Sequence, residues 1–173
     1  MINELVELTD FDLLATGLPP ADSVLAGERL GVARAVTAAE QGRLTPELTD
    51  AIELAAANSS ALVLGITGTG GSGKSSLTDE LIRRFRLDQD DALKIAVISI
   101  DPSRKRTGGA LLGDRIRMNA IQHPNIYMRS LATRDTGSEI SKALPDVIAA
   151  CKVAGFDLIV VETSGIGQGD AAI

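Results

Sequence analysis

The sequence has few aromatic residues and almost no cysteine. Aromatics make up 2% of 173 residues and tryptophan is absent, so the core must be built from aliphatic side chains, as in parallel sheets packed between helices. The single cysteine, Cys151, excludes an internal disulfide and fits a reducing compartment. The ordinary interpretation of this residue is a small buried hydrophobic side chain. No apolar run approaches the roughly 20 residues of a membrane span, and the acidic start does not resemble a signal peptide. We therefore expect a cytoplasmic protein.

The chain also lacks an excess of positive charge. Its net charge is −6, and residues 1–60 hold ten acidic residues against three basic ones. The remaining residues are nearly balanced, with a local basic excess at 101–117. Acidic chains of this kind are poor candidates for general nucleic-acid binding, so we expect neither nucleic acid nor a membrane as a partner.

The order of apolar and polar segments predicts an α/β fold. A mixed arm at 1–21, a helix at 22–42 ending at Gly42, and a second helix capped by Thr45 form a helical segment at 1–57. Short apolar runs then alternate with helical patterns, which indicates parallel strands joined by crossover helices. The predicted strands are 61–66, 94–100, 126–129 and 157–161, and the predicted helices are 74–86, 112–122 and 145–154. We expect residues 58–173 to form a domain whose mainly parallel sheet is flanked by helices and ends at the strand carrying Glu162.

Residues 68–75 match the phosphate-binding pattern G-x-x-x-x-G-K-[ST]. The glycines allow successive backbone N–H groups to point at a phosphate, Lys74 supplies charge for the β- and γ-phosphates, and Ser75 offers a hydroxyl to Mg²⁺. The alternative is an accidental glycine-rich turn, for which a chance match has a probability of roughly 1%. A buried strand before the loop and a helix after it favour the functional interpretation, so we expect residues 58–173 to be a P-loop NTPase domain.

Two acidic residues follow the second and fourth predicted strands. Asp101 and Glu162 should lie at the carboxyl edge of a parallel sheet, beside the phosphate loop, where ligands bind. Magnesium prefers one or two carboxylates together with phosphates and waters. The alternative for each residue is a surface cap or turn.

The segment between these acids carries further candidates. The basic residues and paired glycines of 104–110 are typical of a loop that closes on phosphates. Asp114 and Arg117 are three residues apart and would share a helix face, so that one approaches a metal and the other a phosphate; a surface ion pair is the alternative. Residues 162–165 have the E-x-x-G form of a γ-phosphate sensor.

These motifs resemble the G-protein chaperones of cobalamin-dependent acyl-CoA mutases, and more closely the GTPase domain inside fused isobutyryl-CoA mutases. The resemblance covers about residues 22–173. It rests on the phosphate loop, Asp101-Pro102-Ser103, the run from Thr107 to Met118, the run from Tyr127 to Arg134, and the run from Val161 to Gln168.

The resemblance implies a magnesium-dependent GTPase that gates cobalamin loading and protects a mutase. Adenosylcobalamin would bind to the parent protein, a homodimer, and not to this segment. The implied GTP contacts are Gly71, Ser72, Gly73, Lys74, Ser75, Ser76 and Arg117. The implied magnesium ligands are Ser75, the Ile100 carbonyl, Asp101, Asp114, Glu162 and Thr163, and the implied catalytic residues are Lys74, Asp101 and Glu162.

The Asn-Lys-x-Asp motif by which this family reads guanine does not occur in the sequence. We therefore expect a truncated domain that discriminates poorly between GTP and ATP. Three alternatives stay open: a stand-alone chaperone of methylmalonyl-CoA mutase, a P-loop kinase of a small metabolite with residues 104–106 in its lid, and a module that binds nucleotide without hydrolysis.

Overall fold

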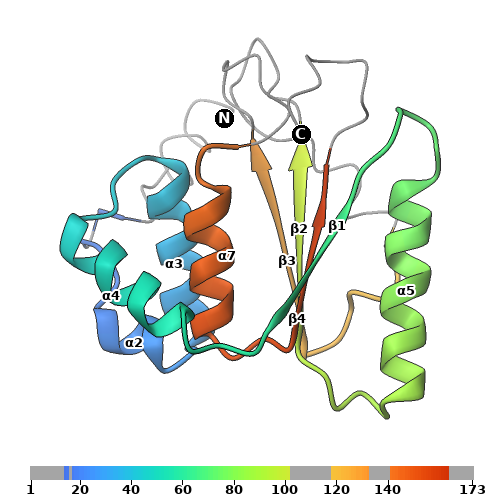
Figure 1. The fold of residues 1–173 in the computed structure, drawn as a ribbon, viewed down its shortest axis with the longest axis horizontal. Coiled ribbons are helices and arrows are strands. Elements are labelled where there is room, and N and C mark those ends of the chain that lie inside the picture. Colours follow the sequence, from blue (N-terminus) through green and yellow to red (C-terminus); the bar gives the residue numbers. More distant parts are fainter. Residues whose placement is uncertain (1–13, 16, 102–117, 133–140, 164–173) are drawn as a thin grey trace, which may run out of the picture.

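The computed structural model describes residues 14–15, 17–101, 118–132 and 141–163. This part of the chain forms a sheet of four parallel strands with helices on both faces (Figure 1). The strand order is β1-β4-β2-β3, and the strands are β1 (Leu62–Ile66), β4 (Leu158–Glu162), β2 (Ile95–Asp101) and β3 (Ile126–Ala132). The predicted α/β fold with a parallel sheet is confirmed. The third strand is longer than the predicted 126–129.

The strand that carries Glu162 lies inside the sheet. All five residues of β4 are buried, and the strand pairs with β1 on one side and with β2 on the other. The expectation that the sheet ends at this strand is therefore wrong for the described residues, in which β1 is an edge strand. Its side chains Leu62, Val63 and Leu64 are exposed, so the prediction of a buried strand before the phosphate loop is wrong for most of β1.

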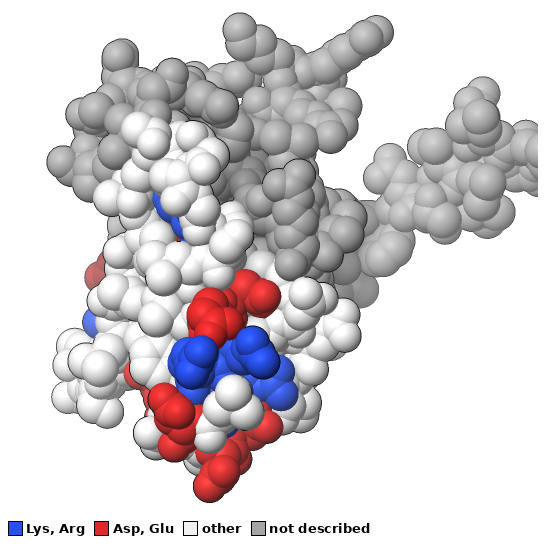
Figure 2. All heavy atoms as spheres, turned by 90° about the vertical axis from the view of Figure 1, so that its right-hand side faces the viewer, with Lys and Arg blue, Asp and Glu red and all other residues white. Residues whose placement is uncertain are grey.

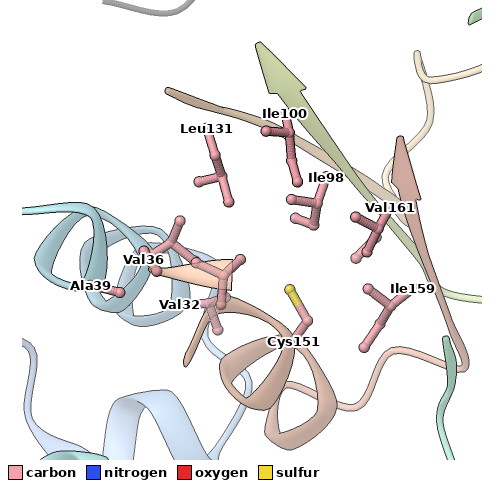
Figure 3. Close-up of a cluster of buried hydrophobic side chains, with 12 residues drawn as sticks. Val32, Val36, Ala39, Ile98, Ile100, Leu131, Cys151, Ile159 and Val161 are labelled. Carbon is pink, nitrogen blue, oxygen red and sulfur yellow. The ribbon is translucent and has the colours of Figure 1, made fainter. Parts of the chain in front are cut away.

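Two apolar clusters hold the layers together. On one face of the sheet, Ile98 and Ile159 pack with Val32, Val36 and Cys151 from two helices (Figure 3). The opposite face packs against α5 (Lys74–Asp88), whose fully buried Ile82 belongs to a second cluster with Ile95, Val97 and Val160. Both faces of the central strands are thus covered, which explains their unbroken apolar sequences.

The outer face of α5 is highly charged. Figure 2 shows Lys and Arg side chains gathered beside Asp and Glu on this side of the molecule. Glu80 pairs with Arg84 at 2.7 Å and with Arg83 at 3.5 Å, and all three side chains are well exposed. Ion pairs of this kind add little stability, so the face is best described as solvated.

The described part of the N-terminal region, residues 14–15 and 17–57, contains three helices. The predicted single helix over 22–42 is wrong, because the chain breaks between α2 (Ala21–Leu25) and α3 (Arg29–Glu40). Gly27 lies in this break with a φ of +70°, and a Cβ there would lie 2.7 Å from the Ala154 carbonyl oxygen. The predicted stop at Gly42 is confirmed by its φ of +63°. The cap at Thr45 is confirmed as well, because its side chain accepts from the Leu48 N–H at the start of α4 (Pro46–Ala56).

Helix α3 packs directly on the sheet beside α7 (Leu144–Val153). The Arg129 guanidinium on β3 donates to the Glu40 carboxylate at 2.7 Å and to the Thr37 hydroxyl at 3.1 Å. Leu14, in the predicted loose arm, is buried. The division into a linker at 1–57 and a domain at 58–173 stays a prediction.

The helix predicted at 112–122 is wrong at its end, because residues 118–122 are a short turn with irregular backbone on either side and not a helix; residues 112–117 lie outside the described part. None of the described helices has the length and apolar character needed to cross a bilayer.

Candidate nucleotide-binding site

The phosphate loop connects β1 to α5 at the carboxyl edge of the sheet. Gly71 and Gly73 have φ values of +77° and +85°, in the left-handed region that glycine enters without strain. Gly73 is the N-cap of α5, and Lys74 is its first helical residue. The loop therefore leads directly into a helix N-terminus, where unpaired N–H groups and the helix dipole favour an anion.

The Lys74 side chain turns back over the loop. Its ammonium donates to the carbonyl oxygens of Gly68 at 3.2 Å and Thr69 at 3.0 Å. Ser72 and Ser76 are exposed on the loop and on the first turn of α5. The positive charge of Lys74 is thus held next to the loop backbone that is predicted to surround a phosphate. This is the position that a lysine needs in order to bind phosphate as a point charge.

The Glu162 carboxylate joins the phosphate loop helix to the sheet. Its side chain is 3% exposed, and one oxygen accepts from the Ser75 hydroxyl at 2.6 Å. The other oxygen accepts from the Thr78 hydroxyl at 3.0 Å. The structure therefore brings together two predicted metal-site residues, Ser75 and Glu162. Sequence reasoning missed Thr78, although its position one turn after Ser75 on the same helix face was a usable signal.

The ends of β1, β4 and β2 converge next to this pair. The N–H of Thr163 donates to the Ile66 carbonyl, and its hydroxyl donates to Thr67, both at 3.0 Å. Ser99 on β2 lies in register with Glu162 on β4. The backbone of Ile100 therefore lies one residue beyond the level of Glu162. Asp101 is the last residue of β2, but its side chain, like Asp114 and Arg117, lies outside the described part.

The described site offers hydroxyl and carboxylate oxygens beside an anion-binding loop. These are the ligands that Mg²⁺ prefers, and magnesium typically needs only one or two carboxylates. No group of three or more His, Cys, Asp or Glu residues suited to a metal occurs among the described residues. Ser75 and Glu162 offer oxygen atoms of the kind that Mg²⁺ takes as ligands.

Two other features lie away from this edge. An open groove of about 820 Å³ is lined by Phe85, Leu93 and Leu158, among others, at the opposite end of the strands from the phosphate loop. Burial raises the pKa of the Cys151 thiol to about 12, so this cysteine is a protonated core residue. The predicted burial of Cys151 is confirmed.

Comparison with known proteins identifies the family. The family model described as methylmalonyl Co-A mutase-associated GTPase MeaB matches residues 32–173. The chain belongs to this family.

Relatives of this MeaB-family chain include much longer proteins. It is 68% identical over its whole length to the fused isobutyryl-CoA mutase of Cupriavidus metallidurans and 57% identical to that of Nocardia farcinica. The chain spans only 16% of the length of each of these proteins. A putative GTPase of Pyrococcus abyssi is 47% identical over 62% of the chain, which spans 33% of that protein.

A solved structure described as the LAO/AO transport system kinase has a similar fold. Its TM-score is 0.60 at 27% identity, over 86% of the MeaB-family chain and 43% of the kinase. The resemblance inferred from the motifs is thus confirmed by the family match, and the P-loop fold by this neighbour.

Proposed function

We propose that this chain binds GTP with magnesium and takes part in its hydrolysis. The observation that carries the proposal is the contact between Ser75 and Glu162, which couples the phosphate-loop helix to the end of β4 next to Lys74. Membership of a GTPase family supports it. Phosphoryl transfer needs mainly positioning and charge stabilisation, and this edge of the sheet supplies both.

The residues would share the work as follows. Lys74 neutralises phosphate charge, Ser75 ligates magnesium through its hydroxyl oxygen, and Glu162 orients Ser75 and the ligands around the ion. Magnesium, when bound, neutralises charge that develops on the phosphates. The remaining predicted contacts are Gly71, Ser72, Gly73, Ser76 and Arg117 for the nucleotide, and Ile100, Asp101, Asp114 and Thr163 for the metal site.

We also propose that the chain serves a cobalamin-dependent acyl-CoA mutase. Relatives that contain its whole length are fused isobutyryl-CoA mutases, which favours a mutase partner in the same polypeptide over the stand-alone chaperone of methylmalonyl-CoA mutase. In this role the GTPase gates cobalamin loading and protects the mutase, while adenosylcobalamin binds elsewhere in the parent protein. A homodimeric parent and a cytoplasmic location remain predictions; the single buried thiol fits a reducing compartment.

Titration of a fluorescent GTP analogue against Lys74→Ala tests the phosphate loop. Loss of a charge-assisted contact of about 1.5–3 kcal/mol should weaken binding roughly 10- to 100-fold. Lys94→Ala is the matched control, because Lys94 is exposed and precedes β2 at the opposite end of the sheet. Equal affinities of Lys74→Ala and the wild type would refute the assignment.

The kinase alternative is favoured by one observation, the name of the similar solved structure. Competition between GTP and ATP separates the two proposals when it is measured on this chain and on a longer one that contains Asn-Lys-x-Asp. We expect weak discrimination in the 173-residue chain, because the phosphate loop reads groups that both nucleotides share. We expect strong guanine preference in the longer chain, where a carboxylate would pair with the base. ATP preference in the longer chain would favour a kinase.

A further inference from the structure

Thr78 is a buried residue whose hydroxyl the proposed function does not use. It is 0% exposed and lies three residues after Ser75 on α5, so both side chains face β4. Its hydroxyl lies 3.0 Å from a Glu162 oxygen and also 3.0 Å from the Lys74 carbonyl oxygen. The second contact is the back-bond that a threonine often makes within a helix.

The Thr78 hydroxyl has one proton and two neighbouring acceptors. The Lys74 carbonyl already accepts the N–H of Thr78 in the regular helical pattern, whereas this Glu162 oxygen has no other donor among the described residues. A carboxylate is also the stronger acceptor, and a buried oxygen without a donor is costly. The Thr78 hydroxyl therefore donates its hydrogen bond to the Glu162 carboxylate.

The two hydroxyls together fix both carboxylate oxygens. With one oxygen held by Thr78, the other keeps its 2.6 Å contact with Ser75. Ser75 then donates its single proton to Glu162 and keeps its lone pairs for a cation beside the phosphate loop. Partners of this kind orient metal ligands and raise their basicity.

We propose that Thr78 is a positioning residue for the magnesium site: it holds the Glu162 carboxylate in the orientation that presents Ser75 to the metal. This inference rests on the proposed function, because it assigns Ser75 and Glu162 to magnesium. Thr78 touches neither nucleotide nor metal in this assignment and acts only through Glu162.

Thr78→Val, Thr78→Ala and Thr78→Ser separate positioning from packing. Valine keeps the shape of threonine without the hydroxyl, and serine restores the hydroxyl. The alanine variant also lacks the hydroxyl and is used if the valine variant does not fold. Thr49→Val is the matched control, since Thr49 is a partly exposed residue of α4. Each protein is titrated with MgCl₂ in the presence of a fluorescent GDP analogue, and again with the analogue in EDTA.

We expect the loss of the hydroxyl to weaken the apparent magnesium affinity about tenfold, the lower end of the effect of removing such an outer partner. Affinity for the analogue in EDTA should change less than about twofold, a limit set by the absence of a direct contact. Thr78→Ser should recover most of the loss, and Thr49→Val should match the wild type.

Three outcomes would overturn the inference. An unchanged magnesium response in Thr78→Val or Thr78→Ala would show that Glu162 does not need the hydroxyl. An equal loss of affinity with magnesium and in EDTA, or no recovery in Thr78→Ser, would show a packing role. A wild type that binds the analogue without any response to magnesium would instead refute the proposed function, and the inference with it.

Discussion

Replacing Gly27 with alanine should destabilise the fold through two separable effects. The φ of +70° at this position costs a residue with a Cβ roughly 1–2 kcal/mol. The added Cβ would also lie 2.7 Å from the Ala154 oxygen and 3.2 Å from its carbon. Backbone atoms cannot rotate away, so we expect roughly a further 1–3 kcal/mol for the overlap. The total loss of unfolding free energy should be about 2–5 kcal/mol.

Gly42→Ala provides the matched control for this prediction. Gly42 has a similar φ of +63°, but a Cβ there would meet nothing within 4 Å. It should therefore lose only the conformational part, roughly 1–2 kcal/mol. Urea unfolding followed by circular dichroism gives both values. Equal losses would contradict the close packing of the turn between α2 and α3 on the end of α7.

Three further predictions follow from the core and from the loop beyond α5. Ile82→Ala should lower the unfolding free energy by about 2–5 kcal/mol, as measured in urea, because Ile82 is fully buried between α5 and the sheet. Cys151 should resist a thiol reagent such as DTNB in the native protein and react fully in denaturant, because burial keeps its pKa at about 12; rapid native labelling would contradict its burial. The Arg86 hydrogen bond lowers the pKa of Asp91 below its ordinary value of 3.8, so the stability that this pair adds is present at neutral pH and lost as the pH falls through the lowered pKa. Asp91→Asn should thus lower the urea midpoint at pH 7 and change it much less at pH 2; an equal effect at both values would refute the ion pair.

The elements near the candidate site could be predicted because their signals are local. The phosphate loop is a contiguous pattern in which each residue has one physical task. The apolar runs of β2 and β4 are explained by strands covered on both faces, whereas the apolar run of β1 predicted a strand but not its exposed position at the edge of the sheet. Thr45 followed by a proline predicted the start of a helix, and the structure has this cap.

The features that were missed depend on residues far apart in the sequence. At Gly27 a helix pattern that looks continuous is interrupted by a φ of +70°, and the Ala154 carbonyl, 127 residues later, leaves no room for a side chain there. The contact between Thr78 and Glu162 needs β4 to lie beside α5, and the strand order that achieves this cannot be read from apolar runs alone. The same strand order places β4 inside the sheet. The sequence suggested that the sheet ends at β4, because this strand comes last in the chain.

The position of β1 in the sheet has a consequence for synthesis on the ribosome. Within the described residues its strand partner is β4, and Thr67 at its end meets Thr163, 96 residues later. This contact cannot form before Thr163 has been synthesised, and closing so long a loop costs more conformational entropy than a local contact does. A nascent chain that has exposed only the phosphate loop and α5 therefore has the nucleotide-binding motif without its neighbouring strand. The nascent chain should gain the capacity to retain nucleotide abruptly, once Glu162 has left the exit tunnel. Nucleotide retention would then indicate that the sheet is complete up to β4.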